Sequence, residues 1–152
     1  MRERVAGVLI LAIAASLAIA ANKPDFTGKW KLIVNRSNFG GAEKPVSMTI
    51  ESTLKSNVMH SVQTEETAQG PQTSEFDWYM DGQRHSTEKP MRGYSLTRWD
   101  NNTLINERRS DDGSYRETIR MTLSSDGKTA TEDIQSKGPN GSNHEKLVFE
   151  RQ

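Results

Sequence analysis

The chain has 152 residues, a length that favours a single domain. Its 20 lysine and arginine residues balance its 20 aspartate and glutamate residues. This balance argues against a nucleic-acid partner, because such proteins usually carry a basic excess. The sequence contains no cysteine, which excludes disulfide scaffolds, thiol nucleophiles and cysteine metal sites.

Residues 1–20 have the pattern of a secretory signal peptide. Arg2 and Arg4 precede an apolar run from Val5 to Ala20, and Ala18-Ile19-Ala20 supplies the small-x-small pattern that signal peptidase recognises. The run is shorter than the ~20 residues that a membrane-spanning helix needs. We therefore expect a cleaved signal helix, with an uncleaved N-terminal anchor as the alternative.

Residues 21–152 are expected to form the exported domain, in a periplasm or the medium, with no membrane span. Short alternating runs and turn signals follow one another there, and no helical period appears. Hairpin dipeptides stand at Asp81-Gly82, Asp112-Gly113 and Asp126-Gly127. Several short strands at regular spacing indicate a sandwich or a barrel, and short connections favour a meander that closes on itself. The predicted fold is all-β, an antiparallel up-and-down meander barrel of about eight to ten strands.

Alternation within each run predicts which side chains face the barrel interior. The predicted inward apolar positions are Phe26, Trp30, Leu32, Val34, Met48, Ile50, Val58, Val62, Phe76, Trp78, Met80, Tyr94, Leu96, Ile119, Met121, Leu123, Leu147 and Phe149. Between 103 and 110 either Leu104 or Ile105 faces inward. If Leu104 faces inward, Asn106 and Arg108 face inward with it. If Ile105 faces inward, Glu107 and Arg109 do so instead.

The segment Phe26-Thr27-Gly28-Lys29-Trp30-Lys31-Leu32 resembles the Gly-x-Trp signature of the calycin barrels, the lipocalins and fatty-acid-binding proteins. The resemblance implies structural roles: Gly28 lets the chain bend at the barrel end, and Trp30 plugs that end. Arg151 either covers Trp30 in a cation–π contact, as an arginine does in lipocalins, or is a frayed terminal residue.

Two differences from the fatty-acid-binding proteins mean that their ligand cannot be assigned to this chain. Residues 37–45 are too few for the helical pair that covers a fatty-acid-binding protein, and Phe149-Glu150-Arg151 replaces its carboxylate-binding Arg-x-Tyr. The chain also resembles small exported bacterial proteins of unassigned function. That second resemblance rests on residues 25–32, 124–129 and 146–151.

Four polar side chains, His60, Arg98, Glu117 and Glu132, also fall on the inward parity. A charge inside a barrel must be paired or hydrated. These residues are either a polar anchor for an amphiphilic ligand or ion pairs at the open end of the barrel. The predicted ligand-binding residues are His60, Trp78, Met80, Tyr94, Arg98 and Met121.

The sequence contains no pattern typical of catalysis or metal binding. His60, His85 and His144 share no metal-ligand spacing, and no serine stands in a nucleophile elbow. We therefore predict no catalytic residue, no metal and no cofactor.

The first function hypothesis is an exported non-catalytic barrel that binds a small apolar or amphiphilic molecule in its interior. The second is a filled barrel whose exposed rim binds an unidentified protein or an envelope component, with an apolar surface patch near Tyr79 and Val148. The third, an enzyme, requires an acid–base pair in the interior, with His60 as its best candidate.

Overall fold

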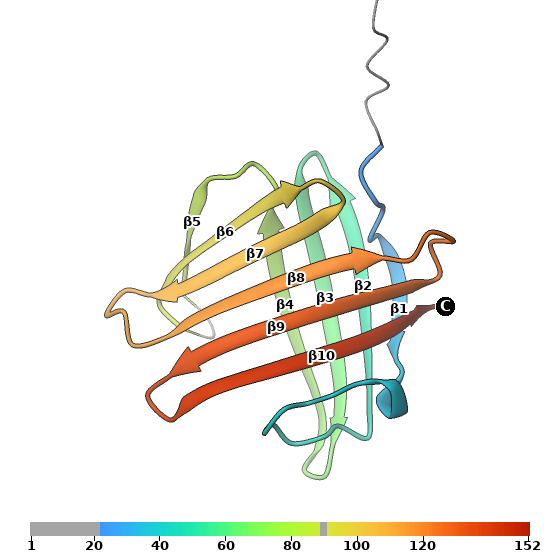
Figure 1. Ribbon diagram of the computed structural model, residues 1–152, viewed down its shortest axis with the longest axis horizontal. Coiled ribbons are helices and arrows are strands. Elements are labelled where there is room, and N and C mark those ends of the chain that lie inside the picture. The colour runs from blue at the N-terminus through green and yellow to red at the C-terminus, as the bar shows by residue number, and fades with distance from the viewer. Residues whose placement is uncertain (1–21, 89–90) are drawn as a thin grey trace, which may run out of the picture.

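The structure, a computed structural model, describes residues 22–88 and 91–152, so the signal peptide predicted for residues 1–20 lies outside the described residues. All strands belong to one antiparallel sheet in the order β4-β3-β2-β1-β10-β9-β8-β7-β6-β5 (Figure 1). The strands are β1 (Gly28–Leu32), β2 (Ser47–Lys55), β3 (Val58–Thr67), β4 (Gly70–Tyr79), β5 (Arg84–Thr87), β6 (Gly93–Asp100), β7 (Thr103–Ser110), β8 (Arg116–Leu123), β9 (Thr129–Gly138) and β10 (Gly141–Arg151). The predicted all-β meander barrel is therefore confirmed, with ten strands.

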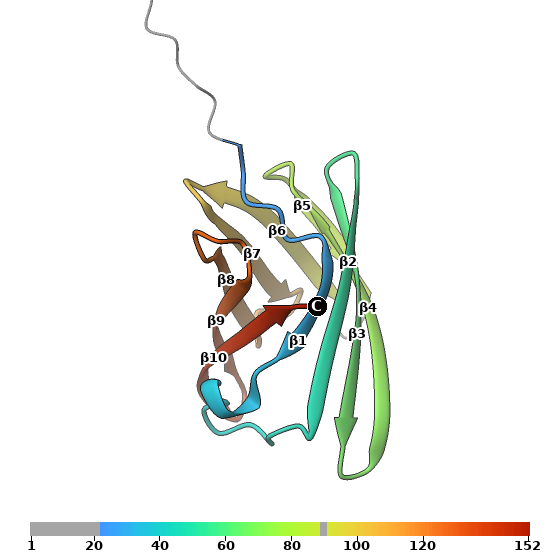
Figure 2. The ribbon, with the colours of Figure 1, turned by 90° about the vertical axis from the view of Figure 1, so that its right-hand side faces the viewer.

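The sheet curls into a nearly closed barrel. Every neighbouring pair is consecutive in the chain except β1 and β10, which pair in the register Trp30↔Arg151 and Leu32↔Phe149. The two edges of the sheet, β4 and β5, do not pair with each other. Figure 2 shows β2, β3 and β4 facing β7, β8 and β9 across the interior. The one helical element in the described part of the chain is the 3-10 turn η1 (Val34–Arg36), and no described helix is long and apolar enough to cross a membrane.

The three predicted hairpin dipeptides all form turns, and those at Asp112-Gly113 and Asp126-Gly127 join paired strands. The hairpin prediction is wrong at Asp81-Gly82, because the flanking strands β4 and β5 do not pair. Gly82, Gly113 and Gly127 have φ values of 72°, 71° and 71°, a backbone conformation that glycine adopts without strain. In each turn the preceding aspartate accepts a hydrogen bond from the backbone N–H two residues on, as Asp112 does from Ser114 at 2.9 Å. Hydrogen bonds from Ser110 and Ser114 lower the pKa of Asp112 to about 2.

The closed end of the barrel is built around Trp30, as the Gly-x-Trp motif implies. Trp30 is 4% exposed, and its indole N–H donates to the carbonyl of Phe26 at 2.9 Å. Arg151 covers it, with the guanidinium carbon 4.2 Å from the ring centroid, so the expected cation–π contact is confirmed. Gly28 has a φ of 103°, and a Cβ there would lie 3.1 Å from Nη1 of Arg151.

The inward prediction is wrong for β3. Met59 and Ser61 are buried inside the barrel, and His60 faces outward with its Nδ1 2.8 Å from Asp77 Oδ1. The reason is the register, which places Met59 opposite the buried Trp78. The inward Ser61 is satisfied by a hydroxyl–hydroxyl bond of 2.8 Å to Ser52, so this face of β3 needs no apolar run.

The inward prediction is also wrong for β6. Ser95 and Thr97 are buried, and both accept hydrogen bonds from the Asn106 amide, at 2.9 and 2.8 Å. Tyr94 therefore faces outward beneath Arg84, and Arg98 forms an outer ion pair with Glu107 at 3.5 Å. The remaining predictions concern single positions on β7 and β10. Leu104 takes the inward place on β7, opposite Met121. Of the predicted surface patch, Tyr79 is exposed, but Val148 is only 6% exposed, so that part of the prediction is wrong.

Candidate ligand-binding cavity

The barrel interior contains a cavity of ≈ 910 Å³ between the two halves of the sheet. Its apolar wall consists of Phe39, Met48, Ile50, Phe76, Trp78, Ile119, Ile134 and Leu147. Below it, toward Trp30, a recess of only ≈ 20 Å³ remains among Met59, Met121 and Phe149. Side chains therefore fill the closed end of the barrel and leave the other end open enough for a ligand.

The loop before β2 covers part of the cavity. Phe39, Ala42 and Pro45 line the cavity from this loop, where the fatty-acid-binding proteins have their helical pair. An isolated bridge between Asn38 and Lys146 holds the loop against β10. As the sequence predicts, a short loop replaces a helical cover at this position.

The unpaired edges of β4 and β5 leave a second recess of ≈ 290 Å³ in the barrel wall. Phe76 and Arg108 line both this recess and the large cavity, so the two spaces adjoin. On the outer side the recess is bordered by His60, Asp77 and Thr87. No backbone hydrogen bond between β4 and β5 closes the barrel wall at this gap.

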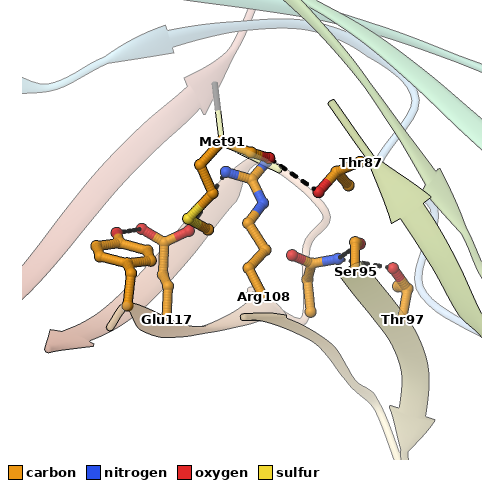
Figure 3. A network of polar contacts seen from close by, with 8 residues as sticks. Thr87, Met91, Ser95, Thr97, Arg108 and Glu117 are labelled. Atoms are coloured by element: carbon orange, nitrogen blue, oxygen red, sulfur yellow. Dashed lines mark hydrogen bonds and ion pairs between the residues drawn. The ribbon is translucent and has the colours of Figure 1, made fainter. Parts of the chain in front are cut away.

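A polar network of β6, β7 and β8 lies at the inner side of this gap (Figure 3). Arg108 Nη1 lies 3.3 Å from Glu117 Oε1, and the Tyr115 hydroxyl donates to Glu117 Oε2 at 2.9 Å. Burial and the neighbouring Glu117 carboxylate raise the pKa of Tyr115 to about 12. Both oxygens of the Glu117 carboxyl group are therefore engaged.

Two further glutamates line the cavity from the paired strands β9 and β10. Glu132 has no hydrogen-bond or ion-pair partner among the described residues, and burial, reinforced by the charge of Glu117, raises its pKa to about 7. Glu145 accepts a hydrogen bond of 2.8 Å from Asn143, and burial raises its pKa as well. Burial therefore disfavours the charged form of both carboxyl groups unless a cation approaches.

The six residues predicted to bind a ligand do not come together. Trp78 lines the large cavity and the small recess, and Met121 lines only the recess. Met80 lines a separate hollow beside Trp99 and Lys23. The inward placement of His60, Tyr94 and Arg98 is wrong, because all three point away from the interior, and only His60 borders the gap.

Sequence reasoning found part of the polar lining. Glu117 and Glu132 face inward as predicted, and the β7 alternative with Asn106 and Arg108 is the observed one. The sequence analysis did not identify Glu145, although this residue lies two positions before the inward-facing Leu147 and therefore on the same face of the strand. Glu65 was missed because the parity of β3 was assigned from Val58 and Val62.

Two observations bear on the predictions about catalysis and metal binding. His60 contacts Asp77, but on the outer face of the barrel wall. Within residues 22–88 and 91–152, no three side chains of the metal-ligating types are grouped so that they would hold an ion.

Solved structures of similar fold are calycin barrels of the fatty-acid-binding type. A fatty-acid-binding protein of Echinococcus granulosus matches with a TM-score of 0.61 and 14% identity over 83% of this chain and 96% of that one. Lipid binding protein 8 of Caenorhabditis elegans matches with a TM-score of 0.65 and 16% identity over 84% and 95%. The zebrafish ileal bile-acid-binding protein, complexed with cholic acid, matches with a TM-score of 0.57 and 12% identity over 84% and 98%.

No protein-family model matches this chain, and no curated protein matches it in sequence. The likeness to solved structures confirms the resemblance to calycin barrels at the level of the fold.

Proposed function

We propose that this protein binds a small apolar or amphiphilic molecule inside its barrel and catalyses no reaction on it. The observation that carries the proposal is the ≈ 910 Å³ cavity, whose size is within the range of small-molecule sites. Such sites combine an apolar wall with a few polar groups that orient the ligand. The structural neighbours named for fatty-acid, lipid and bile-acid binding support the same class of ligand.

Export from the cytoplasm is part of this proposal. Its support is the basic start, apolar run and cleavage pattern of residues 1–20. Fractionation of the native cells tests it, since the processed chain is expected outside the cytoplasm. Unprocessed chain in the cytoplasm would contradict export without affecting ligand binding.

Native mass spectrometry of the processed protein, purified from its own source, tests the binding function. A mass above that of the polypeptide, removed by solvent extraction, would establish a bound small molecule and its class. A bare polypeptide mass together with no uptake of a lipophilic fluorescent probe would contradict the proposal. It would favour a barrel that acts through its surface.

A matched pair of variants on β3 tests whether the fluorescent probe binds inside the cavity. Gln63 lines the cavity, and the neighbouring Val62 faces outward. Gln63→Trp should abolish probe uptake because the indole occupies the cavity, whereas Val62→Trp adds the same side chain outside and should leave uptake unchanged. Equal uptake by both variants would show that the probe binds elsewhere.

A further inference from the structure

The lining of the cavity carries an excess of acidic groups. Six glutamates and one arginine contribute to it, and Arg108 is already paired with Glu117 at 3.3 Å. Within the described part of the chain, no second lysine or arginine lines the cavity. The carboxyl groups of Glu65, Glu132 and Glu145 are therefore left without a cation from the protein.

Glu132 and Glu145 are placed to act together. They lie on the paired strands β9 and β10, where Glu132 is opposite Leu147 and Glu145 is opposite Ile134. Such diagonal neighbours on one face of a sheet are ~7–8 Å apart at the backbone, a separation that two glutamate side chains can span to a common partner. Apolar Leu147 and Ile134 lie opposite them on the paired strands.

The carboxyl group of Glu132, a partly buried residue of the cavity wall, has no partner among the described residues. An ionised group away from bulk water is costly unless it is paired, and the raised pKa of Glu132 expresses that cost. The charged groups that act on it are Glu117 from β8, Glu145 from β10 and Arg108 from β7. Two of these three repel its charge, and the third is occupied.

A second polar group at the same place also lacks a partner. Trp78, which is 3% exposed and lines the cavity beside Glu132, has an indole N–H with no hydrogen-bond partner among the described residues. Buried polar atoms are rarely left unpaired without a reason.

From this arrangement we propose that the bound molecule is an amphiphilic amine, whose protonated nitrogen pairs with Glu132 and Glu145 while its apolar part packs on Trp78 and Ile119. This inference rests on the proposed ligand-binding function and specifies its ligand class. A carboxylate head would add negative charge to a site that already has an excess of it. The cavity therefore selects against fatty acids.

Three probes of equal chain length test the inference. Dodecylamine, dodecanol and dodecanoate differ only in the head group, and each is titrated at pH 8 below its micelle concentration against a bound fluorescent probe. The amine should bind at least about tenfold more tightly than the alcohol, and the carboxylate more weakly than the alcohol.

Variants then assign the preference to the two carboxyl groups. In Glu132→Gln/Glu145→Gln the amine and the alcohol should bind within about twofold of each other, with affinity for the alcohol unchanged. The control is Glu150→Gln, an exposed outward position on the same strand as Glu145, and it should keep the full preference for the amine. Circular dichroism verifies that each variant is folded.

The outcomes separate this inference from the function on which it rests. If the alcohol or the carboxylate binds as tightly as the amine, the amine assignment is overturned and ligand binding stands. Retention of the preference in the double variant also overturns the assignment. If none of the three probes binds, the binding function fails and the inference fails with it.

Discussion

Arg151 and Trp30 come from the two ends of the barrel sequence and lie directly opposite each other in the pairing of β10 with β1. The guanidinium of Arg151 covers the Trp30 ring and donates hydrogen bonds to the carbonyls of Thr27, Asp25 and Gly127 at 2.6, 2.7 and 3.0 Å. One side chain thus joins the segment before β1, the turn before β9 and the closed end of the core.

Arg151→Met should lower the free energy of unfolding by about 2 kcal/mol, since it removes a cation–π contact and three hydrogen bonds at a partly exposed site. Urea denaturation measures the change. Arg116→Met is the matched control, because Arg116 is exposed on β8, and it should cost less than about 0.5 kcal/mol. Equal losses in the two variants would contradict a special role for Arg151.

Gly28→Ala should destabilise the barrel by more than Gly113→Ala. Both positions have positive φ, but a Cβ at Gly28 would meet Arg151, whereas one at Gly113 would point into open space. We expect about 1 kcal/mol for the turn glycine and about 2 kcal/mol or more for Gly28.

Thermal and urea unfolding compare the two glycine variants. In combination with Arg151→Met, the loss from Gly28→Ala should shrink, because the conflicting guanidinium is gone. Strict additivity of the two losses would show that the Cβ and Arg151 do not interact.

The free energy of unfolding should decrease as the pH rises from 4.5 to about 7, the range in which Glu132 ionises in the folded protein. The pKa of this carboxyl is raised from 4.5 to about 7 in the folded protein. Its neutral form is therefore compatible with burial below pH 4.5, and the cost of ionising it inside the barrel develops between pH 4.5 and about 7. Above that range the cost is constant.

Glu132→Gln removes this cost and should make the protein more stable at pH 8, on the order of 2 kcal/mol, while changing little at pH 4.5. Urea denaturation of both proteins at the two pH values gives the difference, from which the other titrating groups cancel. Glu150→Gln should show no such pH-dependent gain. A gain of equal size at both pH values would point to packing instead of ionisation.

Thr87→Trp should slow both the association and the dissociation of a probe and leave its dissociation constant within about twofold, because Thr87 borders the gap between β4 and β5 and does not line the large cavity. Stopped-flow fluorescence measures both rates. Thr53→Trp, on the exposed outer face of β2, serves as the control. Unchanged rates in both variants would place the route of uptake at another opening, such as the loop around Phe39.

The sequence predicted the strands and the inward faces wherever apolar residues alternate with charged ones. Trp30 with Leu32 and Ile119 with Met121 are examples. The prediction failed where the interior is polar. Ser61 bonds to Ser52 across β2 and β3, and such mutual satisfaction of hydroxyl groups leaves no trace in a pattern of apolarity.

The candidate site was predictable only in part for the same reason. Glu117 and Glu132 follow from the parity of well-patterned strands, whereas Arg108 depended on a choice between adjacent leucine and isoleucine residues. That choice is fixed by Asn106, whose amide donates to both Ser95 and Thr97. The register of paired strands, which the sequence of one strand does not contain, therefore decides the lining of the cavity.

The pairing of β1 with β10 also has a consequence for folding. The strands from β1 to β4 and from β5 to β10 pair with their neighbours in the chain, but the contact that joins these two halves of the sheet requires segments separated by almost the whole barrel. Closing so long a loop is slow compared with forming hairpins. The last step of folding is therefore expected to be the docking of the C-terminal strand, and until then Trp30 and Phe149 are exposed to solvent and prone to aggregation.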